Sequence, residues 1–250
     1  MTLPAWLIFT LFALIVAGAH VLEGITGFGS TALSMPFLTL LVGVQLAKPV
    51  LTIYTLLLCV YILAREYRRV DLRVFGKMAV CLLTGLPVGV AAYSRLPQDL
   101  LLAALAVFMI AVSLRGLLQT SGAVRAGKPV RGRVGLLLVF LGGILHGAFA
   151  SGGPLIVIYS ADALPGKSTF RATMCLVWLT LNTILLAQMG VAGELTSEVW
   201  GLSARGLPFL VAGTLLGDAA HKRVSARKFT LLMYAMLLLS GAALVWNLLA

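Results

Sequence analysis

A stretch of glycines, hydroxyls and titratable side chains interrupts the apolar start of the chain. It runs from His20 to Pro36 and reads H-V-L-E-G-I-T-G-F-G-S-T-A-L-S-M-P. Glycine and proline break helices. A helix that begins again after such a break presents backbone N–H groups and partial positive charge at its N-terminus, where anions bind. The stretch therefore has the composition of an anion site.

A second stretch, His146–Ala163, reads H-G-A-F-A-S-G-G-P-L-I-V-I-Y-S-A-D-A and has the same ingredients. Non-helical backbone at membrane depth is tolerated only where protein buries it or where it lines a cavity. We predict that the two stretches face each other and form one anion site. Its predicted substrate-binding residues are Gly27, Phe28, Gly29, Ser30, Ser151, Gly152, Gly153 and Pro154. The alternative is that these glycines only permit close helix packing.

Four titratable residues in or near these stretches are candidates for proton coupling. They are His20, Glu23, His146 and Asp162. A carboxylate inside a membrane segment is a functional candidate by default, and Glu23 is the deepest by sequence. Histidine exchanges protons near neutral pH, although a histidine in such a place is more often a hydrogen-bonded structural residue.

Two cations follow the broken stretches. Lys48 and Arg171 are each predicted at the start of a helix, where a positive charge is unfavourable unless something compensates it. An anionic substrate would do so, and guanidinium binds sulfonate or carboxylate oxygens in a fork. The alternative for both residues is a side chain that reaches the membrane surface.

The elements that must position these residues are apolar helices. Of the 250 residues, 60% are hydrophobic and 11% are charged, and the mean hydropathy is +1.04. Soluble domains contain about 25% charged residues. We predict an all-α polytopic membrane protein without a separate soluble domain. Its apolar segments are 4–22, 25–46, 49–64, 78–94, 100–118, 134–150, 152–164, 172–189, 205–220 and 229–249.

Loop charges predict the orientation. Basic residues cluster at 65–77, 115–133 and 222–228, whereas the loop at 190–204 carries Glu194 and Glu198. The positive-inside rule puts the basic loops in the cytoplasm and the N-terminus outside. It also explains the net charge of +11 without a nucleic-acid partner. We expect a multi-pass protein of the plasma membrane, which in bacteria is the inner membrane.

The order of segments predicts two inverted repeats, each a broken or re-entrant helical hairpin followed by three transmembrane helices. The N-terminal repeat is 1–118, the cytoplasmic linker is 119–133 and the C-terminal repeat is 134–250. His20 and His146 take corresponding places before their glycine clusters. The pairs Gly85/Gly89 and Gly213/Gly217 are expected to bring helix backbones close together.

Other kinds of chemistry have no support in the sequence. Cys59, Cys81 and Cys175 lie in apolar runs without C-x-x-C spacing, which predicts buried thiols without a disulfide or a metal. Because H-E-x-x-H, Walker A and G-x-S-x-G motifs are missing, we expect no enzyme, no metal and no cofactor. The expected partners are a small anionic substrate and the lipid bilayer. A homodimer is left open.

Several of these motifs resemble the sulfite exporter TauE/SafE family of membrane permeases. They are G-I-T-G-F-G-S-T-A-L-S-M-P-F-L, H-G-A-F-A-S-G-G-P-L-I and F-R-A-T. The resemblance covers nearly the whole chain. It implies transport, coupled to protons, of small sulfur-containing anions such as sulfite, sulfoacetate or taurine-related organosulfonates. The positions that match the family are Gly27, Gly29, Ser30, Gly152, Gly153, Pro154 and Arg171.

The chain departs from this family at two places. Its first motif reads Gly27-Phe28-Gly29-Ser30 instead of consecutive glycines, and its first basic residue is Lys48 instead of arginine. The function predicted first is a secondary transporter. The alternative is an anion channel or passive pore that uses the same positive helix ends without a proton carrier.

Overall fold

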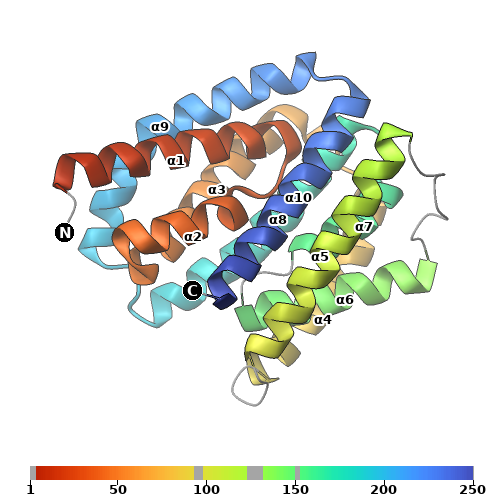
Figure 1. The fold of residues 1–250 in the computed structure, drawn as a ribbon, viewed down its shortest axis with the longest axis horizontal. Coiled ribbons are helices and arrows are strands. Elements are labelled where there is room, and N and C mark those ends of the chain that lie inside the picture. Colours follow the sequence, from red (N-terminus) through yellow and green to blue (C-terminus); the bar gives the residue numbers. More distant parts are fainter. Residues whose placement is uncertain (1–3, 93–97, 123–131, 150–152, 250) are drawn as a thin grey trace. The chain divides into compact units, whose positions relative to one another are not determined.

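The computed structural model describes residues 4–92, 98–122, 132–149 and 153–249, and every regular element in these ranges is a helix (Figure 1). The α-helices are α1 (Ala5–Thr26), α2 (Ser30–Val42), α3 (Val44–Glu66), α4 (Leu72–Ala92), α5 (Gln98–Ser121), α6 (Gly132–Phe149), α7 (Gly153–Ala163), α8 (Lys167–Val191), α9 (Ser197–Arg223) and α10 (Ala226–Leu249). A 3-10 turn, Tyr67–Arg69, follows α3. The prediction of an all-α protein is confirmed.

Several helices are longer than the apolar pattern predicts. The segment predicted at 205–220 belongs to α9, which begins at Ser197, where Thr196 Oγ1 accepts a hydrogen bond from Val199 N at 3.4 Å. Asp71 plays the same part before α4, accepting from the backbone N–H groups two and three residues later at 3.0 and 2.9 Å. Hydropathy detects only the apolar part of a helix, whereas capping side chains decide where it begins.

Five of the helical segments are long and apolar enough to cross a bilayer, for which about 20 residues are needed. Within the described residues these are Ala5–Thr26, Val44–Arg69, Leu72–Gly89, Lys167–Val191 and Ser197–Arg223. The chain is therefore a multi-pass membrane protein. The external N-terminus stays a prediction, as do the same-side hairpins.

The helices divide into two compact units. The first comprises Met1–Arg68 with Met174–Val224, and the second comprises Arg69–Thr173 with Ser225–Ala250. Each unit thus combines helices from both halves of the sequence. The predicted repeats at 1–118 and 134–250 concern the sequence and stay a prediction, and most of the linker at 119–133 lies outside the described residues.

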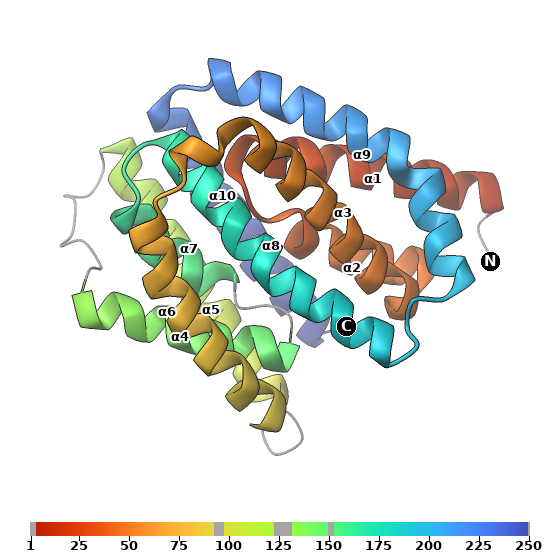
Figure 2. The same ribbon diagram turned by 180° about the vertical axis from the view of Figure 1, so that it is seen from behind.

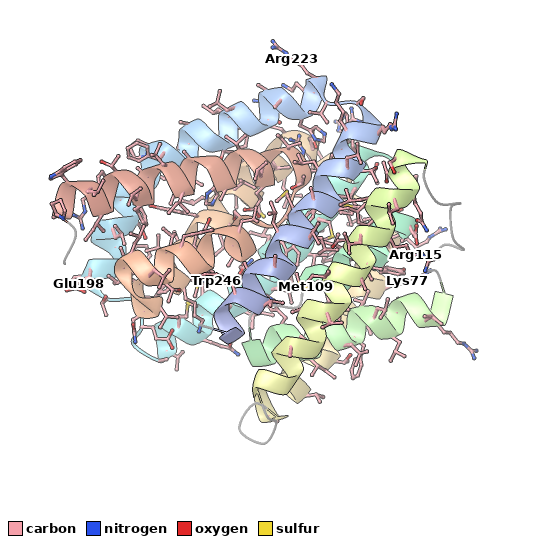
Figure 3. The ribbon with its side chains drawn as sticks, in the orientation of Figure 1. Lys77, Met109, Arg115, Glu198, Arg223 and Trp246 are labelled. Atoms are coloured by element: carbon pink, nitrogen blue, oxygen red, sulfur yellow. The ribbon has the colours of Figure 1, made fainter. Side chains whose placement is uncertain are left out.

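In the first unit, α1 packs lengthwise on α9, and α2 and α3 complete the bundle (Figures 1 and 2). An apolar core that includes Phe12, Val16, Leu51, Tyr54 and Leu210 holds these helices together. Figure 3 shows that α9 carries charges at both ends, with Glu198 at its start and Arg223 at its finish. These signs match the helix dipole.

Glycines bring α1 and α9 into close contact. A Cβ atom at Gly213 would lie 2.5 Å from the carbonyl oxygen of Ala17, and one at Gly24 would lie 3.2 Å from that of Thr214. Gly217 faces Gly24 at a similarly short distance. The prediction that Gly213 and Gly217 serve helix packing is confirmed.

Gly213→Ala is expected to lower the stability of the protein because its methyl group would overlap Ala17. Such overpacking costs about 1–3 kcal/mol. Thermal unfolding of the detergent-solubilised protein, followed by size-exclusion chromatography, measures the loss. Gly18→Ala is the control, since nothing lies within 4 Å of its added Cβ. An equal loss in both variants would contradict the packing role of Gly213.

The second unit is built in a comparable way. Helix α4 packs on α6, α5 packs on α10, and α7 lies against α6. A Cβ at Gly85 of α4 would overlap the carbonyl oxygen of Phe140 on α6, and one at Gly147 would overlap that of Leu86. Met109 of α5, labelled in Figure 3, is buried in an apolar cluster with residues of α7 and α10.

The cysteines mostly agree with the sequence. Cys59 and Cys175 are buried and free, whereas Cys81 is free but only half-buried. The expectation that Cys81 is buried is therefore wrong, because the face of α4 that carries it is not fully covered. The thiols of Cys59 and Cys175 lie within hydrogen-bonding reach of each other in the first unit.

Candidate functional site: the break between α1 and α2

Two glycines create the break. Helix α1 ends at Thr26, Gly27 has φ +82° and Gly29 has φ +101°. This left-handed region is costly for residues with a Cβ, so the turn depends on glycine at both places. Gly27 N donates to Glu23 O at 2.6 Å and closes α1. Phe28, between the glycines, is 5% exposed, so the break is buried inside the first unit.

The break leaves the start of α2 open to an acceptor. Gly29 is the N-cap residue and provides no side-chain hydrogen bond. The N–H groups of the first turn, beginning at Ser30, have no partner within the helix. These groups and the dipole of α2 make this end locally positive, and Thr31 Oγ1 lies 3.3 Å from Thr55 Oγ1 of α3.

A carboxylate from α1 reaches this positive end. Ser30 Oγ donates a hydrogen bond to Glu23 Oε2 across the break. Glu23 is 1% exposed and Ser30 is 0% exposed. Two residues that the sequence predicts separately, one for proton coupling and one for substrate binding, are therefore in direct contact. The Glu23 carboxyl group therefore lies beside the first residue of α2.

Other hydroxyls surround this contact. Thr26 Oγ1 lies 2.8 Å from Leu22 O and 2.9 Å from Phe28 O, and thereby links the last turn of α1 to the residue between the two glycines. Ser34, one turn beyond Ser30 on α2, is buried, and its Oγ has no hydrogen-bond partner among the described residues. The sequence shows these hydroxyls, but it does not reveal that Thr26 holds Phe28 against the end of α1.

Helix α9 supports the break from outside the motif. His221 Nδ1 donates to Ile25 O at 2.6 Å, which satisfies one of the last carbonyl groups of α1. Asp218 is held by Arg65 and Lys222, each at 3.7 Å. Sequence reasoning missed His221 as a residue of this site, because 196 positions separate it from Ile25 and no local pattern connects them.

His20 is completely buried one turn before Glu23. Its Nδ1 lies 2.7 Å from Val16 O, and its ring meets the Tyr54 ring edge-on at 5.7 Å between centroids. Its Nε2 has no hydrogen-bond partner within the described residues. Cys59 of α3 also lies near the Glu23 carboxyl group.

The second broken stretch lies in the other unit and is described in part. Helix α6 ends at Phe149 and α7 begins at Gly153, followed by Pro154 in its first turn, where proline is tolerated. The predicted site residues Ser151 and Gly152 lie outside the described residues. His146 of α6 is buried at 9% exposure. Asp162 is half-buried in the last turn of α7.

The two predicted cations differ. Arg171 is 0% exposed and is the largest fully buried side chain among the described residues. Lys48 is 37% exposed in its side chain and lies 3.9 Å from Glu194. The sequence predicts both at helix starts, which is wrong by about one turn, because α3 begins at Val44 and α8 begins at Lys167. The two positive charges therefore lie farther from the positive N-terminal ends of their helices, and their unfavourable interaction with the helix dipole is smaller.

The predicted residues thus fall into two groups. Gly27, Phe28, Gly29 and Ser30 come together with Glu23 in the first unit. Gly153, Pro154 and Arg171 belong to the second unit. Their predicted convergence on a single site stays a prediction.

Comparison with known proteins supplies the family. The family model for the sulfite exporter TauE/SafE matches residues 11–244. A curated relative named "Probable inner membrane transporter protein TsaS", from Comamonas testosteroni, is 25% identical over 187 residues, which cover 73% of this chain and 76% of that protein. No solved structure matches the chain. The family match covers nearly all of the described helices and includes both breaks, so the chain belongs to the sulfite exporter TauE/SafE family of membrane transporters.

Proposed function

We propose that this protein is a proton-coupled secondary transporter of small sulfur-containing anions, such as sulfite or organosulfonates. The observation that carries the proposal is the contact of Glu23 with Ser30 at the α2 N-terminus. Family membership supports the substrate class. The name of the TsaS relative supports a place in the bacterial inner membrane.

The contact suggests how a proton and an anion are coupled. An ionised Glu23 puts a negative charge at the positive end of α2, where it repels a second anion. A protonated Glu23 no longer opposes an anion, so the N–H groups of the α2 first turn and Ser30 Oγ become available to substrate oxygens. Proton binding and anion binding then favour each other, as linkage requires.

The groups around Glu23 favour it as the proton carrier. Asp218 is already compensated by two cations, whereas Glu23 forms no ion pair within the described residues. The other titratable neighbours are His20 on α1, Cys59 on α3 and His221 on α9. His221 is engaged with a backbone carbonyl. His20 stays a second candidate because its Nε2 has no partner in the described part of the chain.

The packing of the two units supports the inverted repeat. The first helix of one half packs on the fourth helix of the other half in both units, as α1 on α9 and as α6 on α4. The tight glycine contacts have the same spacing in both pairs, which makes Gly24 the counterpart of Gly147. In this register Glu23, which precedes Gly24, corresponds to His146. The pairing of Glu23 with His146 therefore replaces the pairing of His20 with His146 that the sequence predicts.

Because of this correspondence, we propose that His146 has the same role in the second unit that Glu23 has in the first. Both residues are titratable, buried and one position before a tightly packed glycine. We keep Gly153, Pro154 and Arg171 as proposed substrate-binding residues of the second unit, together with Ser151 and Gly152. The proposed roles of Lys48 and Asp162 are weaker, because Lys48 has a surface ion pair and Asp162 is half-buried.

Transport into proteoliposomes tests the proposal. With sulfoacetate on both sides and an acidic exterior, the intact protein is expected to accumulate the anion inside, since proton and anion enter together. A coupling of about 1–3 kcal/mol between the two ligands corresponds to about 5- to 150-fold in affinity. Addition of a protonophore, with the membrane potential clamped, should remove the accumulation.

A channel gives a different result. It would equilibrate sulfoacetate according to the anion gradient and the membrane potential, with no response to the pH gradient. That outcome would overturn proton coupling and favour the passive pore. Absence of flux for sulfite, sulfoacetate and taurine alike, in protein that is folded by size-exclusion chromatography, would overturn the substrate class.

A further inference from the structure

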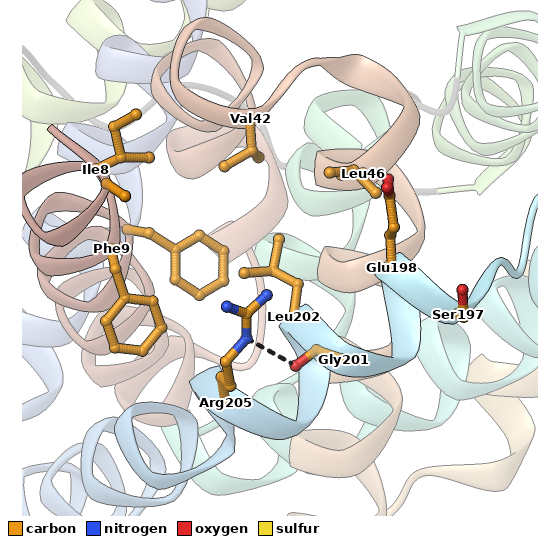
Figure 4. Close-up of a pocket in the computed structure, with 11 residues that line it drawn as sticks. Ile8, Phe9, Val42, Leu46, Ser197, Glu198, Gly201, Leu202 and Arg205 are labelled. Atoms are coloured by element: carbon orange, nitrogen blue, oxygen red, sulfur yellow. Dashed lines mark hydrogen bonds between the residues drawn. The ribbon is translucent and has the colours of Figure 1, made fainter. Parts of the chain in front are cut away.

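A cavity of about 520 Å³ opens in the first unit, away from the break (Figure 4). It lies among the first turns of α1, the α2–α3 connection and the start of α9. Apolar side chains form most of its wall, and two charged residues, Glu198 and Arg205, contribute to it. The mechanism proposed above does not use this cavity.

Arg205 supplies the cavity with a directed positive charge. Its Nε donates to Gly201 O at 3.2 Å, one turn earlier on α9. In Figure 4 the guanidinium end points into the cavity between Phe9 and Leu202, whereas the Glu198 carboxylate lies beside Leu46 on another side. A guanidinium group above apolar walls suits a small organic anion that has a charged head and a short apolar part.

Phe12 is one of the residues that line this cavity. It is 0% exposed. Gly206 of α9 contacts both Phe12 and the hydroxyl group of Tyr54, since a Cβ there would lie 2.7 Å from Phe12 Cε1 and would overlap the Tyr54 hydroxyl oxygen. The Tyr54 hydroxyl donates to Ser203 O at 2.9 Å. Phe12 therefore lines the cavity and contacts the same residue of α9 as the Tyr54 hydroxyl group.

Two residues that contact Tyr54 carry unpartnered polar atoms. His20 Nε2 and Ser203 Oγ are both buried without a hydrogen-bond partner among the described residues. His20 packs edge-on against Tyr54 and precedes Glu23 by one turn. Buried polar groups are normally satisfied by protein, water or a ligand. A polar solute that moved from the cavity toward the Glu23–Ser30 contact would therefore find unsatisfied hydrogen-bonding groups at His20 and Ser203.

We propose that the cavity is an outer binding site for a small organic anion such as an alkyl sulfonate, and that Phe12 is the barrier between this site and a polar passage that runs past Tyr54 and His20 to Glu23. Arg205 attracts and holds the anion, and displacement of the Phe12 ring admits it. The proposal rests on the proposed function for the identity of the substrate.

Chemical labelling of Ser203→Cys tests the barrier directly. The background replaces Cys59, Cys81 and Cys175 with serine. The probe is sulfonatoethyl methanethiosulfonate, an anion: the thiolate introduced at position 203 forms a disulfide with its thioethylsulfonate part, and methanesulfinate leaves. We expect slow labelling with Phe12 intact. Phe12→Ala should raise the rate about tenfold or more, because labelling of a buried thiol follows the open population.

The charge of the probe tests Arg205. Arg205→Gln should slow the anionic reagent about tenfold, by loss of electrostatic attraction, and should leave or raise the rate of trimethylammonioethyl methanethiosulfonate, a cation. Arg223→Gln, at the opposite end of α9 (Figure 3), is the control and should change neither rate. Leu14→Ala, an exposed position of α1, is the control for Phe12→Ala.

The outcomes separate this inference from the proposed function. Labelling unchanged by Phe12→Ala and by the milder Phe12→Leu would overturn the barrier, even if transport is proton-coupled. Equal slowing of both reagents by Arg205→Gln would overturn the anion site. If labelling follows the expectation but transport ignores the pH gradient, the proposed coupling fails and the outer site stands. Phe12→Leu keeps the test decisive should Phe12→Ala not fold.

Discussion

Glu23→Gln is expected to abolish pH-driven accumulation of sulfoacetate while anion-for-anion exchange continues. Glutamine imitates the protonated carboxyl group and can still contact Ser30. The anion should therefore bind the variant well, but no proton can be released to complete a coupled cycle. In proteoliposomes, the accumulation ratio should fall to that of protein-free vesicles, and exchange of labelled for unlabelled sulfoacetate should remain.

The pH dependence of binding gives the sign of the coupling. In the intact protein, affinity for sulfoacetate should rise as the pH falls, because protonation removes the negative charge of Glu23 from the α2 N-terminus. In Glu23→Gln the affinity should be high and independent of pH. A thermal-shift titration with sulfoacetate measures both, since a ligand that binds the folded state raises its apparent stability.

Two variants complete this test. Glu23→Asp keeps a titratable group and should keep some accumulation, whereas Glu66→Gln, at the end of α3, should behave like the intact protein. Normal accumulation by Glu23→Gln would exclude Glu23 as the proton carrier. His20 and His146 would then be the remaining candidates for the proton carrier.

Arg171→Ala is expected to produce the second large effect, a loss of sulfonate binding. Arg171 is fully buried, and removal of the guanidinium from a buried pair with an anion costs about 2–5 kcal/mol, or roughly 30- to 5,000-fold in affinity. Equilibrium binding of radiolabelled sulfoacetate to the purified protein measures the change.

A buried arginine also stabilises the fold, so the comparison variants matter. Arg171→Lys keeps the charge but not the two-pronged geometry. It should fold well and still bind sulfonate weakly. Lys48→Ala should change affinity little, because a partly exposed ion pair such as Lys48 with Glu194 contributes about 0–1 kcal/mol. Unchanged affinity in folded Arg171→Lys and Arg171→Ala would remove Arg171 from the site.

Much of the architecture can be predicted from the sequence because it depends on local patterns. Long apolar runs make membrane helices, and each predicted apolar segment corresponds to a described helix. The break between α1 and α2 is also local, since Gly27 and Gly29 allow the left-handed backbone at that place. The burial of Glu23 likewise follows from its position between apolar residues.

The three-dimensional structure alone decided which of these residues meet. The Glu23–Ser30 contact depends on how the chain turns at the break. The hydrogen bond of His221 to Ile25 depends on α9 packing along α1. The cavity beside Arg205 and its Phe12 wall likewise combine distant segments. Hydropathy tells which residues are buried away from water, but many different pairings of the helices would bury these residues equally well. The choice among these pairings follows from close packing. Because Gly24 and Gly217 have no side chains, the backbones of α1 and α9 come close together there, and the break lies against α9.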